Sequence, residues 1–418
     1  MNIKYFLPDW EDRLDPKFNF KTDCFSPEHK KNPTANDVHA HDLLTPPPYD
    51  GVLFSLANFI KKSSSLDLKN PKIRGYTDIK KYLKLNGTLQ VMGDCGAFSY
   101  INEDIPPEPF FSIENVANFY NKLNFDYGVS VDHIVTDAIQ KIVNGEKVKI
   151  ILSKKDKEKR IKITLNNAKK FLKYHRKQKF DFKPIGVAQG LNPKSYKKSV
   201  EKLIDYGYEY IALGGLVQKE TSEILAILDE IQSKTKNVDI HLFGISRPEA
   251  MREFKEFGVT SFDSASYFRK AFLESNKNYF TKSGKWYSAI RVPYSDNKIL
   301  NENAKKCGYS QNDLEKMEKI AMKSLIKYDQ GKLPLEETLN SLINYDKILL
   351  RRQEKIETIQ ERYRATLEDK PWKKCDCDIC GQLGIHVIIF RGTNRNKRRG
   401  FHNVWTFNRY FNGFHEKE

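Results

Sequence analysis

Three cysteines lie within six residues late in the chain, at Cys375, Cys377 and Cys380, while the other three are scattered. The cysteines are therefore too few and too dispersed for a disulfide scaffold. In a cytosolic chain such crowded thiols are typical of metal ligation, and three of them with one histidine would form a closed tetrahedral zinc site. Both His386 and His402 follow closely enough to be the fourth ligand, so spacing alone leaves that ligand open.

Three aspartates, Asp94, Asp132 and Asp263, each follow a short apolar run. A single aspartate in that position is most simply a helix N-cap or a turn residue. Three that converge on one barrel mouth are harder to explain in this way, because barrel enzymes carry their catalytic side chains at strand ends. A close pair of carboxylates, one a nucleophile and the other an acid/base, performs retaining glycosyl chemistry.

The elements that must position these residues are seven apolar runs, most of them separated by helical patterns such as 195–206 and 222–232. The runs lie at 51–55, 89–94, 127–132, 185–190, 210–215, 240–244 and 259–263. Strands that alternate with helices predict a parallel sheet, and seven is one short of a (β/α)8 TIM barrel. We place the eighth strand within residues 58–87.

The pattern changes to long helices after residue 300, with segments at 313–328 and 335–366. We therefore expect three parts: an α/β TIM-barrel catalytic domain with a basic insertion near 141–183, a helical insertion, and a small zinc-binding subdomain. Their predicted boundaries are 1–300, 301–368 and 369–418.

The 418-residue chain has a formal net charge of +17, and residues 141–183 hold sixteen basic against four acidic residues. Such an excess predicts a polyanionic partner, either nucleic acid or an anionic membrane surface. The membrane is disfavoured because no run approaches the roughly 20 apolar residues of a spanning helix, and the first nine residues are not typical of a signal peptide. We expect a soluble, cytoplasmic protein that contacts nucleic acid.

Two basic clusters are candidates for contact with phosphate groups. The first, 153–160, is predicted as an exposed loop that precedes a helix at 166–179. The second follows the cysteines. Charge runs usually form solvated surfaces, but this local concentration is equally typical of a surface that follows a phosphate backbone. The residues that we select are Lys154, Lys155, Arg160, Arg395, Arg398 and Arg399.

Five motifs, in this order, resemble those of the tRNA-guanine transglycosylase family. They are Asp94-Cys95-Gly96-Ala97-Phe98, similar to DSGG(F/Y); Gly186-Val187-Ala188-Gln189-Gly190, similar to GxxQG; Ala212-Leu213-Gly214-Gly215-Leu216, similar to (A/G)xGGL; Phe262-Asp263, similar to the strand end with the nucleophile; and Cys375-x-Cys377-x2-Cys380 with His402-Asn403, similar to CxCxxC…HN. The resemblance runs from about residue 51 to 410. Its His-Asn match favours His402 over His386 as the fourth zinc ligand.

The resemblance implies a base exchange by double displacement. Asp263 would attack C1′ of the nucleoside and form a covalent glycosyl-enzyme, and Asp94 would protonate the departing guanine and deprotonate the incoming base. A structural Zn2+ would be held by the three cysteines and His402. The implied base-binding residues are Phe98, Asp132, Gln189, Gly190, Gly215, Leu216 and Phe243.

The segments 39–51 and 394–403 are more similar to a divergent branch, the Dpd-type DNA-guanine transglycosylases. This implies DNA as the polymer and 7-cyano-7-deazaguanine (preQ0) as the incoming 7-deazaguanine. The chain lacks the G-x-x-x-x-G-K-[ST] motif, so an ATPase partner would be a separate protein. The alternatives are a tRNA-guanine transglycosylase of the queuosine or archaeosine type, and a non-catalytic zinc-containing nucleic-acid-binding protein.

Overall fold

The computed structural model describes residues 3–60, 76–143, 145–348 and 356–413. The chain forms two compact units. The barrel unit comprises Met1–Glu11, Tyr49–Ala265 and Phe411–Glu418, and the second unit comprises Asp12–Pro48 and Ser266–Tyr410. Residues 12–48 and 266–300, which the sequence pattern placed with the barrel, therefore fold with the C-terminal segment. The three predicted functional domains stay a prediction.

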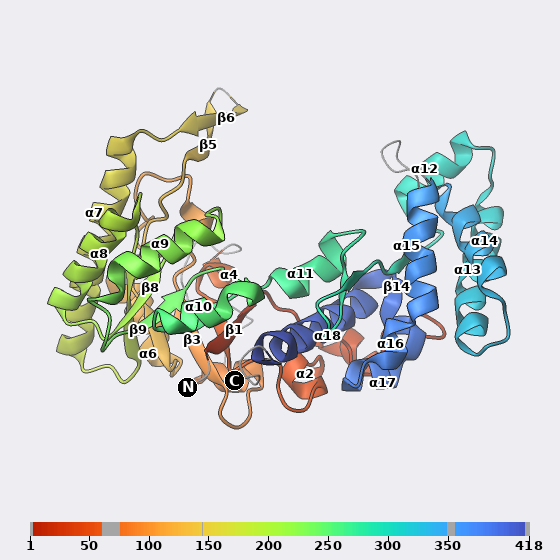
Figure 1. The fold of residues 1–418 in the computed structure, drawn as a ribbon, viewed down its shortest axis with the longest axis horizontal. Coiled ribbons are helices and arrows are strands. Elements are labelled where there is room, and N and C mark those ends of the chain that lie inside the picture. The colour runs from red at the N-terminus through yellow and green to blue at the C-terminus, as the bar shows by residue number, and fades with distance from the viewer. Residues whose placement is uncertain (1–2, 61–75, 144, 349–355, 414–418) are drawn as a thin grey trace. The chain divides into compact units, whose positions relative to one another are not determined.

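The barrel unit is built on eight strands that close into a parallel barrel in the order β1-β10-β9-β8-β7-β4-β3-β2. Figure 1 labels β1, β3, β8 and β9 among them. Their bounds are β1 Lys4–Asp9, β2 Gly51–Ser55, β3 Gln90–Asp94, β4 Tyr127–Val129, β7 Lys183–Ala188, β8 Tyr210–Leu213, β9 Asp239–Leu242 and β10 Val259–Asp263. The helices of this unit are α4 Ala57–Ile60, α5 Ile79–Leu83, η1 Ala97–Tyr100, α6 Ile113–Lys122, α7 Lys154–Gln178, α8 Pro193–Tyr206, α9 Thr221–Gln232, η2 Pro248–Ala250 and α10 Met251–Glu256. The predicted TIM barrel is confirmed, as are the seven predicted strands.

The eighth strand is β1, so its predicted position within 58–87 is wrong. In the described part of that range, 58–60 belongs to α4 and 79–83 to α5, while 61–75 lies outside the described residues. The sequence concealed β1 because its apolar run is short and ends at Pro8 and Asp9. Its register pairs Phe6 with Asp263 on one side and with Gly51 on the other, which closes the barrel.

Inward-facing side chains fill the barrel with a packed core. Its buried members are Phe6, Leu53, Met92, Val129, Ile185, Val187, Tyr210 and Ala212. Such a filled interior leaves chemistry to the ends of the strands, since the centre of the barrel is a core rather than a pore.

The basic insertion is an antiparallel hairpin followed by one long helix, and it lies in the connection after β4. The hairpin consists of β5 Ala138–Val143 and β6 Glu146–Ile151. The predicted loop at 153–160 is wrong, because these residues form the first turns of α7. Ser153 caps that helix through a capping box with Asp156, and Lys and Glu are good helix formers, so charge density alone did not exclude a helix.

The second unit contains the helical insertion and the cysteine segment. Its elements are α1 Pro27–Lys31, α2 Pro33–Asn36, α3 Ala40–Leu43, α11 Ser266–Leu273, β11 Tyr279–Phe280, β12 Trp286–Tyr287, β13 Ile290–Arg291, α12 Lys298–Lys306, α13 Gln311–Asp329, α14 Leu335–Asp346, α15 Ile356–Asp369, α16 Pro371–Lys374, α17 Asp378–Leu383, η3 Gly384–Ile388, β14 Ile389–Phe390 and α18 Gly392–Gly413, which belongs to this unit up to Tyr410. Among the described residues, no helix has both the length and the apolar character that a membrane crossing requires.

Candidate functional site

Three carboxylates gather at the C-terminal ends of the barrel strands, where β3 ends at Asp94, β10 ends at Asp263, and Asp132 follows β4. Burial disfavours the charged form of Asp94, and the negative charges of Asp132 and Asp263 disfavour it further. Together they raise the pKa of Asp94 from 3.8 to about 7, although the Gly96 N–H and the Ser55 hydroxyl oppose the rise. Asp94 is thus a carboxyl group that can both donate and accept a proton near neutral pH.

Asp132 is buried in a network of uncharged partners. Gln189 Nε2 donates to its Oδ2 at 2.9 Å, and Cys95 Sγ lies 3.6 Å from its Oδ1. Tyr100 donates its hydroxyl to the Asp132 carbonyl at 2.8 Å and contacts Cys95 Sγ at 3.2 Å. Burial raises the pKa of Asp132 to about 6, and the bonds from Gln189 and Cys95 limit that rise.

The side chain of Gln189 occupies space that is free only because the two residues after the next strand, Gly214 and Gly215, have no side chain. A Cβ on Gly214 would lie 2.3 Å from Gln189 Nε2, and Gly215 has φ of +72° and would place a Cβ 2.9 Å from Gln189 Oε1. Both positions therefore require glycine, the first for space and the second also for its backbone. Gly190 has the same need, because a Cβ there would meet the Tyr196 ring at 2.5 Å.

Asp263 holds one carboxylate oxygen between two donors. Oδ1 accepts from the Gly244 N–H at 3.0 Å, and His241 Nε2 lies 3.1 Å away. His241 is fully buried, and no role for it was predicted from the sequence. Strand alternation could have found it: His241 and Phe243 share one face of their run, as Ser261 and Asp263 do on the next strand.

The aromatic and apolar residues predicted to bind the base differ in exposure. Phe98, on η1, is 66% exposed and presents its ring to solvent. Phe243 is half-buried and meets the His241 ring edge-on at 4.8 Å. Leu216, in contrast, is fully buried.

Four of the six basic residues predicted to contact nucleic acid are buried, which corrects that expectation for them. Arg160 donates to the carbonyls of Ile134, Ile101 and Glu103 at 2.8, 2.9 and 3.2 Å. Lys154 and Lys155, in contrast, are exposed in the first turn of α7. The β4–α7 connection joins the strand end to the start of α7, so these lysines lie at the barrel end that carries the aspartates.

The other three buried arginines all lie on α18 in the second unit. Arg395 pairs with Asp23 and donates to Phe20 O at 2.9 Å, and Arg398 donates to Asp15 O at 3.1 Å. Arg399 is fully buried and donates to carbonyls, including Ala271 O at 2.6 Å. Their guanidinium groups satisfy main-chain acceptors, so they stabilise the fold instead of facing phosphate.

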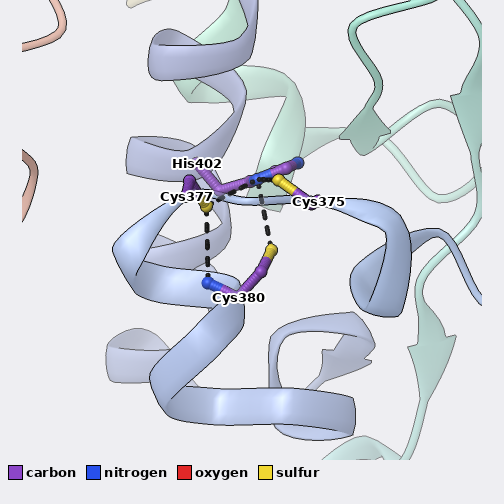
Figure 2. Close-up of side chains that lie close together, drawn as sticks. All are labelled: Cys375, Cys377, Cys380 and His402. Atoms are coloured by element: carbon purple, nitrogen blue, oxygen red, sulfur yellow. Dashed lines mark hydrogen bonds between the residues drawn. The ribbon is translucent and has the colours of Figure 1, made fainter.

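Cys375, Cys377, Cys380 and His402 form one cluster whose ligand atoms all lie within 4.8 Å of one another (Figure 2). His402 Nδ1 lies 3.6, 3.4 and 3.4 Å from the three sulfur atoms in chain order. Its Nε2 lies 2.8 Å from Phe280 O, which fixes Nδ1 as the ligating nitrogen. This donor set fits a tetrahedral metal site, and His386 is not part of the cluster.

Comparisons with known proteins identify the family of this chain. A family model described as queuine tRNA-ribosyltransferase matches residues 66–411. A DNA-guanine transglycosylase of Salmonella montevideo is 40% identical over 96% of this chain and 95% of its own length. A queuine tRNA-ribosyltransferase of Chlamydia felis is 30% identical over 105 residues, which are 25% of this chain and 28% of that protein.

The chain therefore belongs to the queuine tRNA-ribosyltransferase family and is a base-exchanging glycosyltransferase. Within that class it is a guanine transglycosylase, as both the family match and the full-length relative indicate.

Proposed function

We propose that this enzyme exchanges guanine in DNA for a 7-deazaguanine, with 7-cyano-7-deazaguanine as the incoming base. The observation that carries the chemistry is the convergence of Asp94 and Asp263 with different environments. Asp94 has a pKa of about 7, whereas Asp263 Oδ1 is held by hydrogen-bond donors. Two carboxylates set apart in this way suit one acid/base and one nucleophile. The DNA assignment rests on similarity to the Salmonella montevideo relative.

In the first step Asp263 attacks C1′ as the C1′–N9 bond of a deoxyguanosine in the DNA breaks, and Asp94 gives its proton to the departing guanine. The product is a glycosyl ester on Asp263 and an ionised Asp94. In the second step Asp94 removes the N9 proton of the incoming base, whose N9 attacks C1′ and releases Asp263. Two inversions retain the configuration, and no ATP is consumed in the exchange.

The buried polar network is proposed to recognise the base. Asp132 and Gln189 are already joined at 2.9 Å, which fixes both side chains before a guanine edge binds to them. Phe98 and Phe243 supply rings for stacking on the base. Gly190, Gly215 and Leu216 supply backbone groups close to it.

We propose that the exposed lysines at the start of α7 contact the DNA backbone. Positive side chains at a helix N-terminus are unfavourable by a few tenths of a kcal/mol each, and a phosphate group there would remove that penalty. A guanine in a duplex must also be flipped out, at a cost of a few kcal/mol. A separate ATPase partner is proposed to assist where duplex opening needs energy.

The cysteine cluster is proposed to hold one structural Zn2+ in the second unit. Bound zinc supplies folding free energy by crosslinking the cysteine segment to α18.

The test is release of radiolabelled guanine from DNA and, in parallel, from tRNA, upon addition of 7-cyano-7-deazaguanine. We expect release from DNA, and a protein–DNA adduct of reduced mobility on denaturing gels. Asp263→Asn should abolish both while leaving DNA binding and thermal unfolding unchanged. Asp239→Asn, which changes an aspartate at the opposite end of β9, is the matched control and should behave as wild type.

Three outcomes would contradict parts of this proposal. Release from tRNA alone would assign the enzyme to tRNA modification. An adduct that persists in Asp263→Asn would move the nucleophile to Asp94 or Asp132. Tight DNA binding without release from either polymer would favour a non-catalytic binding protein.

A further inference from the structure

A chain of four buried side chains leads from the barrel core to the carboxylate of Asp263. Tyr210 Oη lies 2.5 Å from Ser261 Oγ, which lies 2.7 Å from His241 Nδ1. His241 Nε2 lies 3.1 Å from Asp263 Oδ1. Tyr210, Ser261 and His241 have 4%, 1% and 0% of their surface exposed, so water does not replace these partners.

With Asp263 ionised and His241 neutral, each hydrogen bond in this series of side chains has a single possible direction. An ionised carboxylate only accepts, so His241 must carry its proton on Nε2 and donate it to Oδ1. Nδ1 of the neutral imidazole is then an acceptor and takes the proton of Ser261. The Ser261 oxygen in turn accepts from the Tyr210 hydroxyl, whose pKa burial raises well above its usual range, and which therefore remains a donor.

We propose that His241 is a positioning residue for the nucleophile, and that Ser261 and Tyr210 hold it in the required tautomer. With the Gly244 N–H, His241 fixes Oδ1 between two donors. None of the described residues donates to Oδ2. The geometry thus selects Oδ2 as the oxygen that attacks C1′.

This inference rests on the proposed function and specifies the step that His241 serves. When Oδ2 bonds to C1′, Oδ1 becomes the ester carbonyl oxygen, and both donors can still bind it. When the incoming base attacks C1′, the electron pair of the C1′–Oδ2 bond returns to the carboxylate, and the donors stabilise the charge that develops there. No proton passes through His241 in either step.

The first experiment compares His241→Leu with His241→Gln, whose side-chain amide can still donate near the position of Nε2. Loss of the donor that holds the Asp263 carboxylate in its attacking orientation predicts a roughly 10- to 100-fold slower formation of the adduct for His241→Leu. The KM for the incoming base should change less than about twofold, because the base does not contact His241. His241→Gln should recover a substantial part of the rate, which a purely structural role would not predict.

A matched pair of tyrosine variants tests the hydrogen bond from Tyr210 to Ser261, which is the one farthest from Asp263. Tyr210→Phe removes the donor to Ser261, whereas Tyr208→Phe removes a hydroxyl that is equally buried but donates to Ala168 O. Only Tyr210→Phe should slow adduct formation, and both should unfold at similar temperatures. Equal rates of adduct formation for the wild type and His241→Leu would overturn the proposal.

The second experiment does not depend on catalysis. In protein labelled with 15N at histidine, the His241 signals, assigned by their loss in His241→Gln, should show a protonated Nε2 and an unprotonated Nδ1. Ser261→Ala should shift the Nδ1 signal. A proton on Nδ1 in the wild type would overturn the proposed tautomer, even if the wild type releases no guanine. Absence of guanine release would by itself count only against the proposed function.

Discussion

Replacing Asp94 by asparagine should inactivate the enzyme and also stabilise its fold. The pKa of Asp94 is raised in the folded protein from 3.8 to about 7. A carboxyl group with a raised pKa contributes most to stability when it is protonated, and this contribution is lost as the pH rises through the folded-state value. Asparagine stays neutral at every pH and avoids that loss.

The size of the gain follows from the two pKa values. The difference of about 3 pH units, at about 1.4 kcal/mol each, corresponds to about 4 kcal/mol when Asp94 is fully ionised. At about pH 5 the folded form is still protonated, so the stabilisation by Asp94→Asn should grow by about 2 to 3 kcal/mol between about pH 5 and about pH 8.

Urea unfolding of both proteins at the two pH values measures this difference. Asp205→Asn, at an exposed position of α8, is the control and should change the free energy of unfolding by less than about 0.5 kcal/mol at both. A gain for Asp94→Asn that is equal at the two pH values, or a loss at the higher one, would refute the reasoning that burial and neighbouring carboxylates set this pKa.

Three further predictions concern the charged and metal-binding residues. The double variant Lys154→Ala, Lys155→Ala should weaken DNA binding and reduce the salt slope of the binding constant by about 2, with unchanged unfolding; an unchanged slope would exclude phosphate contacts. Arg160→Met should leave DNA binding unchanged but lower the free energy of unfolding by about 3 kcal/mol, because three carbonyls lose their donor. Weaker DNA binding without a loss of stability would contradict the buried, structural role of Arg160. Cys380→Ser should lose bound zinc in elemental analysis and lower the unfolding temperature, and full zinc occupancy would remove Cys380 from the ligand set.

The sequence predicted the barrel because seven of its strands are compact apolar runs flanked by small or acidic residues. It missed β1, whose run ends at Pro8, since proline in a sequence usually argues against a strand within a sheet. It also assigned the charged residues at the start of α7 to a loop. A high density of charge indicates that a segment is exposed to solvent, but it does not distinguish a loop from a helix. The start of the helix is indicated instead by Ser153 and Asp156, whose spacing allows a capping box.

The site was predictable to the extent that its residues lie in motifs. Asp94, Asp132 and Asp263 were found as strand-end residues, and the cysteines by their spacing. The arginines of α18 could not be assigned, because sequence does not show which main-chain carbonyls lack a partner in the fold. Strand alternation placed His241 on the same face of its run as Phe243, but it was missed because its partners Ser261 and Asp263 come beside it only through the pairing of β9 with β10.

Closure of the barrel by β1 also determines at which stage of synthesis and folding the site can form. Tyr5 donates its hydroxyl to Ser264 O at 2.7 Å across 259 residues of sequence, and its ring stacks on Phe262 at 5.0 Å. Contacts of such long range form slowly, because closing the long intervening loop costs entropy before the contact is gained. During synthesis β1 must therefore wait, unpaired with β10, until the segment that carries Asp263 has left the ribosome. A nascent chain that stops short of that segment lacks both the proposed nucleophile and a closed barrel wall, so base exchange by the proposed mechanism requires the completed barrel.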